Sequence, residues 1–267
     1  MIRFSNLHTH TTFSDGKGTV RENVESAIKK NMLSLGFSDH SFTACDPTYC
    51  MPYEKYGEYR AAVRAIKEEY KDRLPIYLGI EKDYYSEIDS SEYDYVIASV
   101  HYIVKNGICY PIDHSRAQQE ECIRDVFGGN VLNFAEYYYN MVVEHVERAR
   151  PLCVGHFDVL NKFSIMPEAD DRYIEMTISA MKEAAKYCNC FELNTGGISR
   201  GWRKIPYPSD YLLKTLLDIG GRVVINSDSH HPDNLDFFFN ESVELMRNVG
   251  YDSFSVFNGT GFDTVKI

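Results

Sequence analysis

Residues 3–16 read RFSNLHTHTTFSDG, a short apolar run that leads directly into His8, His10 and Asp15. The run predicts a β-strand, and side chains two positions apart on a strand lie on the same face. Both imidazoles should therefore project together, as two ligands of one metal ion would. An HxH pair alone is a weak signal, so the remaining ligands must come from elsewhere in the chain.

Six further runs rich in β-branched and apolar residues predict strands at 32–38, 75–81, 95–101, 152–157, 190–194 and 222–227. Segments with apolar residues at helical spacing lie between most of them, at 19–31, 56–70, 133–150, 171–187, 209–218 and 235–249. This alternation predicts a parallel sheet, either a barrel or a doubly wound sheet. We find no repeat or linker and expect one domain over residues 1–267. Residues 101–133 lack either pattern, which favours a long functional loop.

Each predicted strand ends in side chains that can bind metals or form hydrogen bonds. These residues are His8 and His10, Asp39 and His40, Glu81, His101, His156, Glu192 and Asn194, and Asp228 and His230. In a parallel barrel the C-terminal ends of the strands share one face, and active sites are built there. Imidazole and carboxylate together suit Zn, Mn or Fe. The pattern therefore predicts a metal site on this face.

The composition narrows the class of partner. Basic residues number 28 and acidic residues 39, which gives a net charge of -11 and disfavours binding to a nucleic-acid backbone. We expect no membrane span and no signal peptide, and hence a cytoplasmic protein. The seven cysteines are odd in number and scattered, which favours reduced thiols. The sequence does not indicate an oligomeric state.

Six stretches resemble motifs of the polymerase-and-histidinol-phosphatase (PHP) family. They are HTHTTFSDG, GFSDH, LGIE, ASVHY, VGHFD and NSDSH, which follow the family's order between residues 8 and 230. Finer features resemble the histidinol-phosphatase branch: YPID after ASVHY, then ELNTGG and YPS. The resemblance implies a distorted (β/α)7 barrel with the metal site at the C-terminal ends of its strands.

The resemblance also implies three divalent metal ions, which could be zinc, manganese or iron. Their ligands would form three sets: His8, His10, Glu81 and Asp228; Glu81, His101 and His156; Asp15, His40 and His230. A hydroxide that bridges the two ions sharing Glu81 would attack a metal-bound phosphate. Asp228 could be a ligand only or could also carry a proton.

Cationic residues near the same face are candidates for binding phosphate. Arg200 follows the sixth strand, and Arg116 and Lys162 are further candidates. Asp113 in YPIDHS could contact a cationic group of the substrate, although the motif favours a turn-forming aspartate. We expect Asp39 to orient His40 rather than to cap a turn. His145 should be a packed or surface histidine.

The resemblance implies hydrolysis of L-histidinol phosphate to L-histidinol and phosphate, in histidine biosynthesis. A second interpretation keeps the metal site and changes the substrate to another small phosphate ester or a nucleotide. A third is a metal-binding module without catalytic activity, against which the complete ligand set argues. The second interpretation extends to a nucleic-acid 3′ end, against which the acidic charge and the lack of a basic, aromatic groove argue. We therefore expect a small phosphate ester as the partner, and neither nucleic acid nor a membrane.

Overall fold

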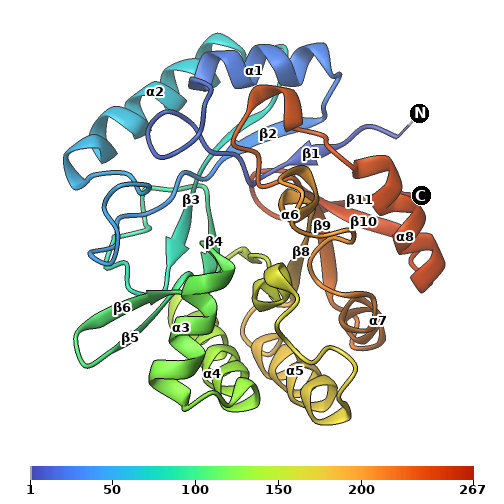
Figure 1. The fold of residues 1–267 in the computed structure, drawn as a ribbon. Helices are drawn as coiled ribbons and strands as arrows, with labels where there is room; N and C mark the ends of the chain where they lie inside the picture. Colours follow the sequence, from blue (N-terminus) through green and yellow to red (C-terminus); the bar gives the residue numbers. More distant parts are fainter. Residues whose placement is uncertain (1) are drawn as a thin grey trace.

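Seven parallel strands form the central sheet of the computed structural model, which describes residues 2–267. In sheet order they are β1 (Ser5–Asn6), β2 (Ser34–Phe37), β3 (Ile76–Asp83), β4 (Tyr95–Ser99), β7 (Cys153–Val154), β8 (Cys190–Asn194) and β9 (Arg222–Asn226). A parallel bridge between Thr9 and Ser229 joins the chain after β1 to the chain after β9. The sheet is thus a nearly closed barrel, which confirms the predicted (β/α)7 architecture (Figure 1).

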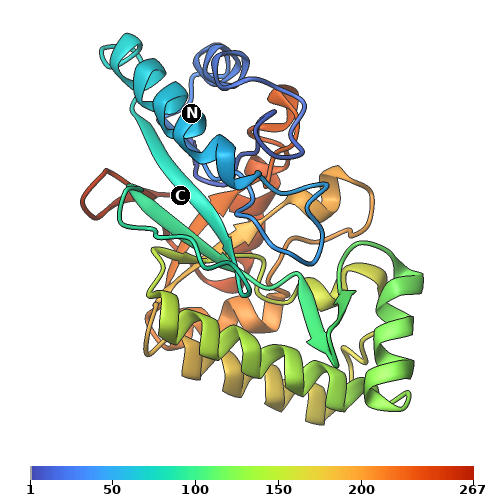
Figure 2. The ribbon, with the colours of Figure 1, turned by 90° about the vertical axis from the view of Figure 1, so that its left-hand side faces the viewer.

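Helices cover the outside of the barrel (Figures 1 and 2). The covering helices are α1 (Val20–Lys29), α2 (Tyr56–Glu69), α4 (Val131–Ala149), α5 (Asp171–Ala184), α7 (Asp210–Asp218) and α8 (Phe239–Val249). The remaining helices are α3 (Arg116–Phe127), which packs on α4, and the short α6 (Gly196–Ser199), which follows β8 at the strand ends. The predicted helices agree to within a few residues, except that α8 begins at Phe239 because Phe238 has a left-handed backbone (φ 64°). Within residues 2–267, no helix combines the length and the apolar character that crossing a bilayer requires.

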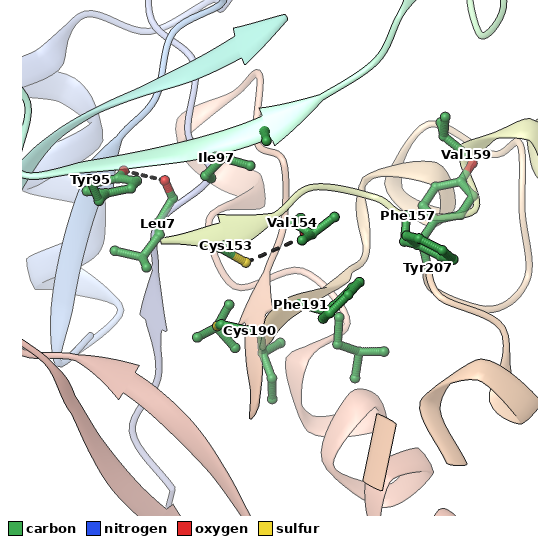
Figure 3. Close-up of a cluster of buried hydrophobic side chains, with 14 of the residues drawn as sticks. Leu7, Tyr95, Ile97, Cys153, Val154, Phe157, Val159, Cys190, Phe191 and Tyr207 are labelled. Carbon is green, nitrogen blue, oxygen red and sulfur yellow. Dashed lines mark hydrogen bonds between the residues drawn. The ribbon is translucent and has the colours of Figure 1, made fainter. Parts of the chain in front are cut away.

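Tyr95 of β4 fills the barrel beneath the strand ends that carry the polar residues. Its hydroxyl donates a hydrogen bond to the carbonyl oxygen of Leu7 (Figure 3). The carbonyl oxygen of Phe37 lies 3.1 Å from the same hydroxyl and shares its proton. Gly36 and Gly79 leave room for the ring, since a Cβ at Gly79 would lie 2.2 Å from its Cζ atom. These two glycines therefore serve close packing rather than a turn.

The chain after α8 forms a hairpin of β10 (Ser253–Phe257) and β11 (Phe262–Lys266), which the sequence patterns did not predict. Its aromatic rings pack at the beginnings of the barrel strands: Phe254 stacks on Phe4, and Phe257 contacts Tyr77 and Tyr95. The hairpin thereby covers the end of the barrel opposite the polar face.

The prediction of a long irregular loop at residues 101–133 is wrong. This segment contains a hairpin of β5 (Tyr102–Lys105) and β6 (Ile108–Pro111), followed by α3, which lies beside it in Figure 2. Asn106 and Gly107 form the turn with φ angles of 52° and 76°, as expected for an Asn-Gly hairpin turn. Ser115 then caps α3 by accepting a hydrogen bond from the Gln118 amide.

The prediction that all cysteines are reduced thiols is also wrong for two of them. Cys45, in the chain after β2, and Cys109, in β6, form a disulfide with a Cα–Cα distance of 5.4 Å. The sequence did not indicate this pairing, because 64 residues separate the two cysteines and only the folded hairpin brings them together. The other five cysteines are free and buried.

His145 on α4 is packed, as predicted, and gives the fold a specific pH dependence. Burial, together with the charges of Arg148 and Lys82, lowers the pKa of His145 to about 4. In the unfolded chain the pKa of this histidine is about 6.5. The contribution of neutral, buried His145 to the free energy of unfolding is therefore fully present above that pH. It falls by about 1 kcal/mol per pH unit as the pH decreases toward 4.

We therefore expect His145→Gln to reduce the dependence of unfolding free energy on pH. The measurement is denaturant unfolding of metal-free wild type and variant at pH 7 and pH 5 in the same buffer. The wild type should lose more stability than the variant between these two conditions. An identical loss in the two proteins would contradict this assignment.

Candidate metal centre

The structure brings the predicted polar side chains together at the C-terminal ends of the barrel strands. His8 and His10 follow β1, His40 follows β2, Glu81 lies in β3 and His101 follows β4. His156 follows β7, and Asp228 and His230 follow β9. Most of these side chains are buried, and His8, His10 and Glu81 are at most 1% exposed.

One cluster joins His8, His10, Glu81 and Asp228. The Nε2 atom of His8 lies 3.3 Å from Glu81 Oε2, and that of His10 lies 3.2 Å from Asp228 Oδ1. Ligands about 2.1 Å from a tetrahedral ion are separated by about 3.4 Å, close to these distances. His8, His10 and Glu81 are therefore grouped as a divalent ion would require, and Asp228 approaches the two histidines from beside them.

Two further clusters adjoin the first. Glu81 Oε1 lies 3.1 Å from His156 Nε2 and 3.4 Å from His101 Nε2. On the other side, Asp15 lies 3.2 Å from His230 Nε2 and 3.7 Å from His40 Nε2. The expected separation of Asp15 from the HxH pair holds for His8 but not for His10, which forms one group with Asp15, His40 and His230. The boundaries are less sharp than predicted, because His10 also approaches the Asp15 cluster and His40 lies 2.6 Å from Glu81.

Several buried donor and acceptor atoms in these clusters have no hydrogen-bond partner among the described residues. They include Nε2 of His8, both ring nitrogens of His10, Oδ1 of Asp15 and Oε2 of Glu81. Unpaired buried polar atoms are rare in folded proteins because they are costly. Metal ions would satisfy these atoms, so the residues present fit divalent cations.

A second layer of carboxylates holds the histidine rings. Glu192 lies 2.9 Å from His8 Nδ1 and accepts hydrogen bonds from the amides of Asn194 and Asn226. Asp83 lies 3.2 Å from His101 Nδ1. Such contacts fix the orientation of a ligand histidine. Asp83 was missed at the sequence level, although it stands two positions after Glu81 on the same strand face.

Asp39 does not take the role expected for it. Its carboxylate accepts hydrogen bonds from the backbone amides and hydroxyls of Thr11 and Ser14, and none from His40. Asp39 therefore stabilises, through these hydrogen bonds, the turn that precedes Asp15. The alternative that it caps a turn is the correct one.

Charges within the clusters set the protonation of the ligands. Burial would raise the pKa of Glu81, but the nearby charges of His40, His8 and His101 hold it well below its usual value. The pKa of Asp228 is likewise lowered against its burial, first by Arg200 and then by His8. Burial and the charges of His230 and His40 lower the pKa of His10 to about 3. The carboxylates are thus ionised and His10 is neutral, as metal binding requires, whereas the neighbouring carboxylates raise the pKa of His8, His40 and His101 against their burial, so metal binding would displace protons from these rings.

A cavity of about 230 Å³ opens in front of the clusters. Of the three predicted phosphate-binding residues, Arg200 and Lys162 line this cavity, and Arg116 does not. Arg200 donates to Asp228 Oδ2 at 2.8 Å, whereas the guanidinium of Arg116 on α3 binds Glu120 and the carbonyl oxygen of Phe163. Tyr207, which sequence reasoning did not single out, also lines the cavity, and its buried hydroxyl has no partner among the described residues.

A parallel barrel with histidines and carboxylates gathered around one cavity defines a metal-binding protein of the (β/α)-barrel class. The chain belongs to the PHP domain family, whose model matches residues 6–196.

Relatives cover nearly the whole chain. A Deinococcus radiodurans protein named "Probable histidinol-phosphatase" is 30% identical over an alignment of 265 positions that covers 94% of this chain and 95% of that protein. The histidinol-phosphatase of Bacillus subtilis is 26% identical and covers 89% of this chain and 97% of its own length. The crystal structure of a Lactococcus lactis histidinol phosphate phosphatase, complexed with Zn, L-histidinol and phosphate, has a TM-score of 0.72 at 20% identity. It covers 98% of this chain and 100% of its own, and at this identity it supports the fold alone.

Proposed function

We propose that this chain is a metal-dependent phosphomonoesterase that hydrolyses L-histidinol phosphate to L-histidinol and phosphate. The observation that carries the proposal is the gathering of histidine, aspartate and glutamate side chains at the strand ends: seven of them form groups that could hold metal ions, and the cavity beside them also holds two cationic side chains. The full-length similarity to proteins named histidinol-phosphatase supports the choice of substrate. The Lactococcus lactis protein, which has the same fold, is complexed with both products of this reaction.

Three divalent ions, of zinc, manganese or iron, are the proposed cofactors. Their ligands would be the three sets implied by the PHP resemblance, with Glu81 shared between two ions. The geometry of Glu81 supports sharing, because its Oε2 atom faces His8 and its Oε1 atom faces His101 and His156.

When bound, the ions supply Lewis acidity toward the phosphate and activate water at neutral pH. The residues of the chain have distinct tasks around that chemistry. Arg200 and Lys162 line the cavity and would bind phosphate oxygens, which accept charge-assisted hydrogen bonds. Arg200 also holds Asp228 through Oδ2, which leaves Oδ1 directed to the histidines. Asp228, ionised at the outset, would accept the proton that the attacking water loses and pass it to the departing alkoxide, while Glu81 would remain ionised.

Removal of metal ions tests the proposal directly. We expect a chelator to abolish release of phosphate from L-histidinol phosphate and to lower the melting temperature, because ions that bind only the folded chain stabilise it. Zn, Mn or Fe should restore both quantities. Full activity of a protein shown by elemental analysis to be free of metal would contradict the proposal.

Kinetic measurements on the same metal-loaded protein test the proposed substrate. We expect kcat/KM for L-histidinol phosphate to exceed that for p-nitrophenyl phosphate and for nucleoside monophosphates. If kcat/KM for L-histidinol phosphate is no higher than for p-nitrophenyl phosphate, the protein is a metal-dependent phosphatase but the proposed substrate is wrong.

A further inference from the structure

Asp113 is unusual among the acidic residues of the cavity. Three carboxylates line it: Asp15, Asp113 and Asp228. Asp15 belongs to the cluster with His40 and His230, and Asp228 lies against His10 and Arg200. Within residues 2–267, Asp113 is thus the cavity-lining carboxylate that belongs to none of the candidate metal clusters.

The position of Asp113 is fixed by a single ion pair. It follows β6, and its Oδ2 atom accepts a hydrogen bond from Lys162 Nζ at 3.1 Å. No other hydrogen bond to this carboxylate occurs among the described residues, so Oδ1 retains its accepting capacity. The side chain is 22% exposed, which leaves it accessible from the cavity. Asp113 is therefore an anionic group held beside a cation that we assign to phosphate binding.

Aromatic rings form the adjacent wall of the cavity. Tyr102 pairs with Pro111 in the β5–β6 hairpin, and Pro111 precedes Asp113 by two positions. The ring of Tyr102 stacks on that of Tyr49, with ring centroids 6.2 Å apart. The hydroxyl of Tyr49 is buried and unpartnered among the described residues. A carboxylate next to aromatic rings is a suitable environment for an organic ammonium ion.

The proposed substrate has a charge that these groups would match. In L-histidinol phosphate the primary ammonium is carried by the carbon next to the phosphorylated methylene, so it lies within a few ångströms of the phosphate. A group that recognises it must stand close to a phosphate-binding side chain, as Asp113 does through Lys162.

We propose that Asp113 binds the ammonium group of the substrate and so determines the preference for amino-alcohol phosphates over other phosphate monoesters. This inference rests on the proposed function and deepens it by naming a specificity-determining residue. Lys162 and Arg200 hold the phosphate, while Asp113 selects the ester that bears the charge.

The test compares two esters that differ only in the amine. One is L-histidinol phosphate, and the other is imidazolylpropyl phosphate, which keeps the imidazole and lacks the amine. For the wild type, the ratio of kcat/KM for these two esters measures recognition of the ammonium. We expect Asp113→Asn to lower this ratio by about 10- to 100-fold, the effect of losing one charge-assisted hydrogen bond.

Two matched measurements separate this role from a structural one. Arg200→Met should weaken both esters in proportion and leave the ratio near its wild-type value, because Arg200 faces the phosphate they share and its side chain pairs with Asp228 and His230 rather than with Asp113. Inhibition by L-histidinol, relative to the same alcohol without its amine, should lose its preference in Asp113→Asn even if turnover of that variant is too slow to measure.

An unchanged ratio in Asp113→Asn, together with an unchanged inhibitor preference, overturns the inference, whichever way the absolute rates move. Failure of the proposed function has a different signature: the wild type then shows no preference for L-histidinol phosphate over p-nitrophenyl phosphate. Metal content of each variant, determined on the same samples, confirms that the clusters are intact.

Discussion

Replacement of Glu81 by glutamine is expected to lower kcat/KM for L-histidinol phosphate by about 10³-fold or more, the equivalent of several kcal/mol of lost metal-ion stabilisation. Glutamine keeps the size of the side chain and removes its charge. Glu81 is buried at the centre of the site and lies within 3.7 Å of ring nitrogens from five histidines, which are His8, His10, His40, His101 and His156. One substitution therefore weakens more than one proposed metal site.

Elemental analysis and phosphate release should be measured together on this variant. We expect the metal content per chain to fall along with activity. Glu87→Gln is a matched control, because Glu87 is exposed and lies in the connection that follows β3; it should retain both quantities. A Glu81→Gln protein with the full metal content would show that Glu81 is not a shared ligand.

Asp228→Asn has the second largest expected effect, a decrease in kcat of about 10²- to 10⁴-fold, as for the loss of a group that accepts and then donates a proton. The backbone of Asp228 has a φ of 48°, a left-handed conformation that asparagine also tolerates, so the substitution adds little strain. Asparagine loses the charge that faces His10 on one side and Arg200 on the other. The variant thus tests the chemistry rather than the fold.

The identity of the leaving group separates the two possible roles of Asp228. p-Nitrophenolate departs with less need of a proton than the alkoxide of histidinol. If Asp228 moves a proton, the variant should lose more activity toward L-histidinol phosphate than toward p-nitrophenyl phosphate. A residue that acts only as a metal ligand should affect both substrates alike. Asp233→Asn, a change in the exposed part of the following loop, should leave both rates intact, and wild-type rates in Asp228→Asn would refute either role.

The strand and helix patterns predicted a parallel sheet because their signals were local and repeated, and the PHP resemblance then favoured a barrel over a doubly wound sheet. Each strand run ended in a polar residue, and the period-two spacing of His8 and His10 placed both rings on one face before any contact was known. Parallel strands then required these ends to meet. Arg200 and Lys162 could be placed near the same face for the same reason, since each follows a barrel strand closely.

The features that were missed depend on contacts between distant parts of the chain. Residues 101–133 lacked a long helical period, although Asn106 and Gly107 carried the turn signal of the hairpin. The pairing of Cys45 with Cys109 and the carboxylate of Asp39 on the Thr11–Ser14 turn follow from tertiary packing that spacing does not encode. Arg116 had the right charge, but α3 directs it to Glu120 and away from the cavity.

The junction between β1 and β9 has a consequence for the order of events during synthesis. Asn6 donates a hydrogen bond to Ser227, 221 positions later, and Thr9 pairs with Ser229. The barrel can close only after the ribosome has released the segment that follows β9. Folding dominated by such long-range contacts is slow, and intermediates expose unpaired edges. Because His8 and His10 gain Asp228 as a neighbour only at closure, a growing chain holds at most part of the first cluster, and complete metal loading follows release.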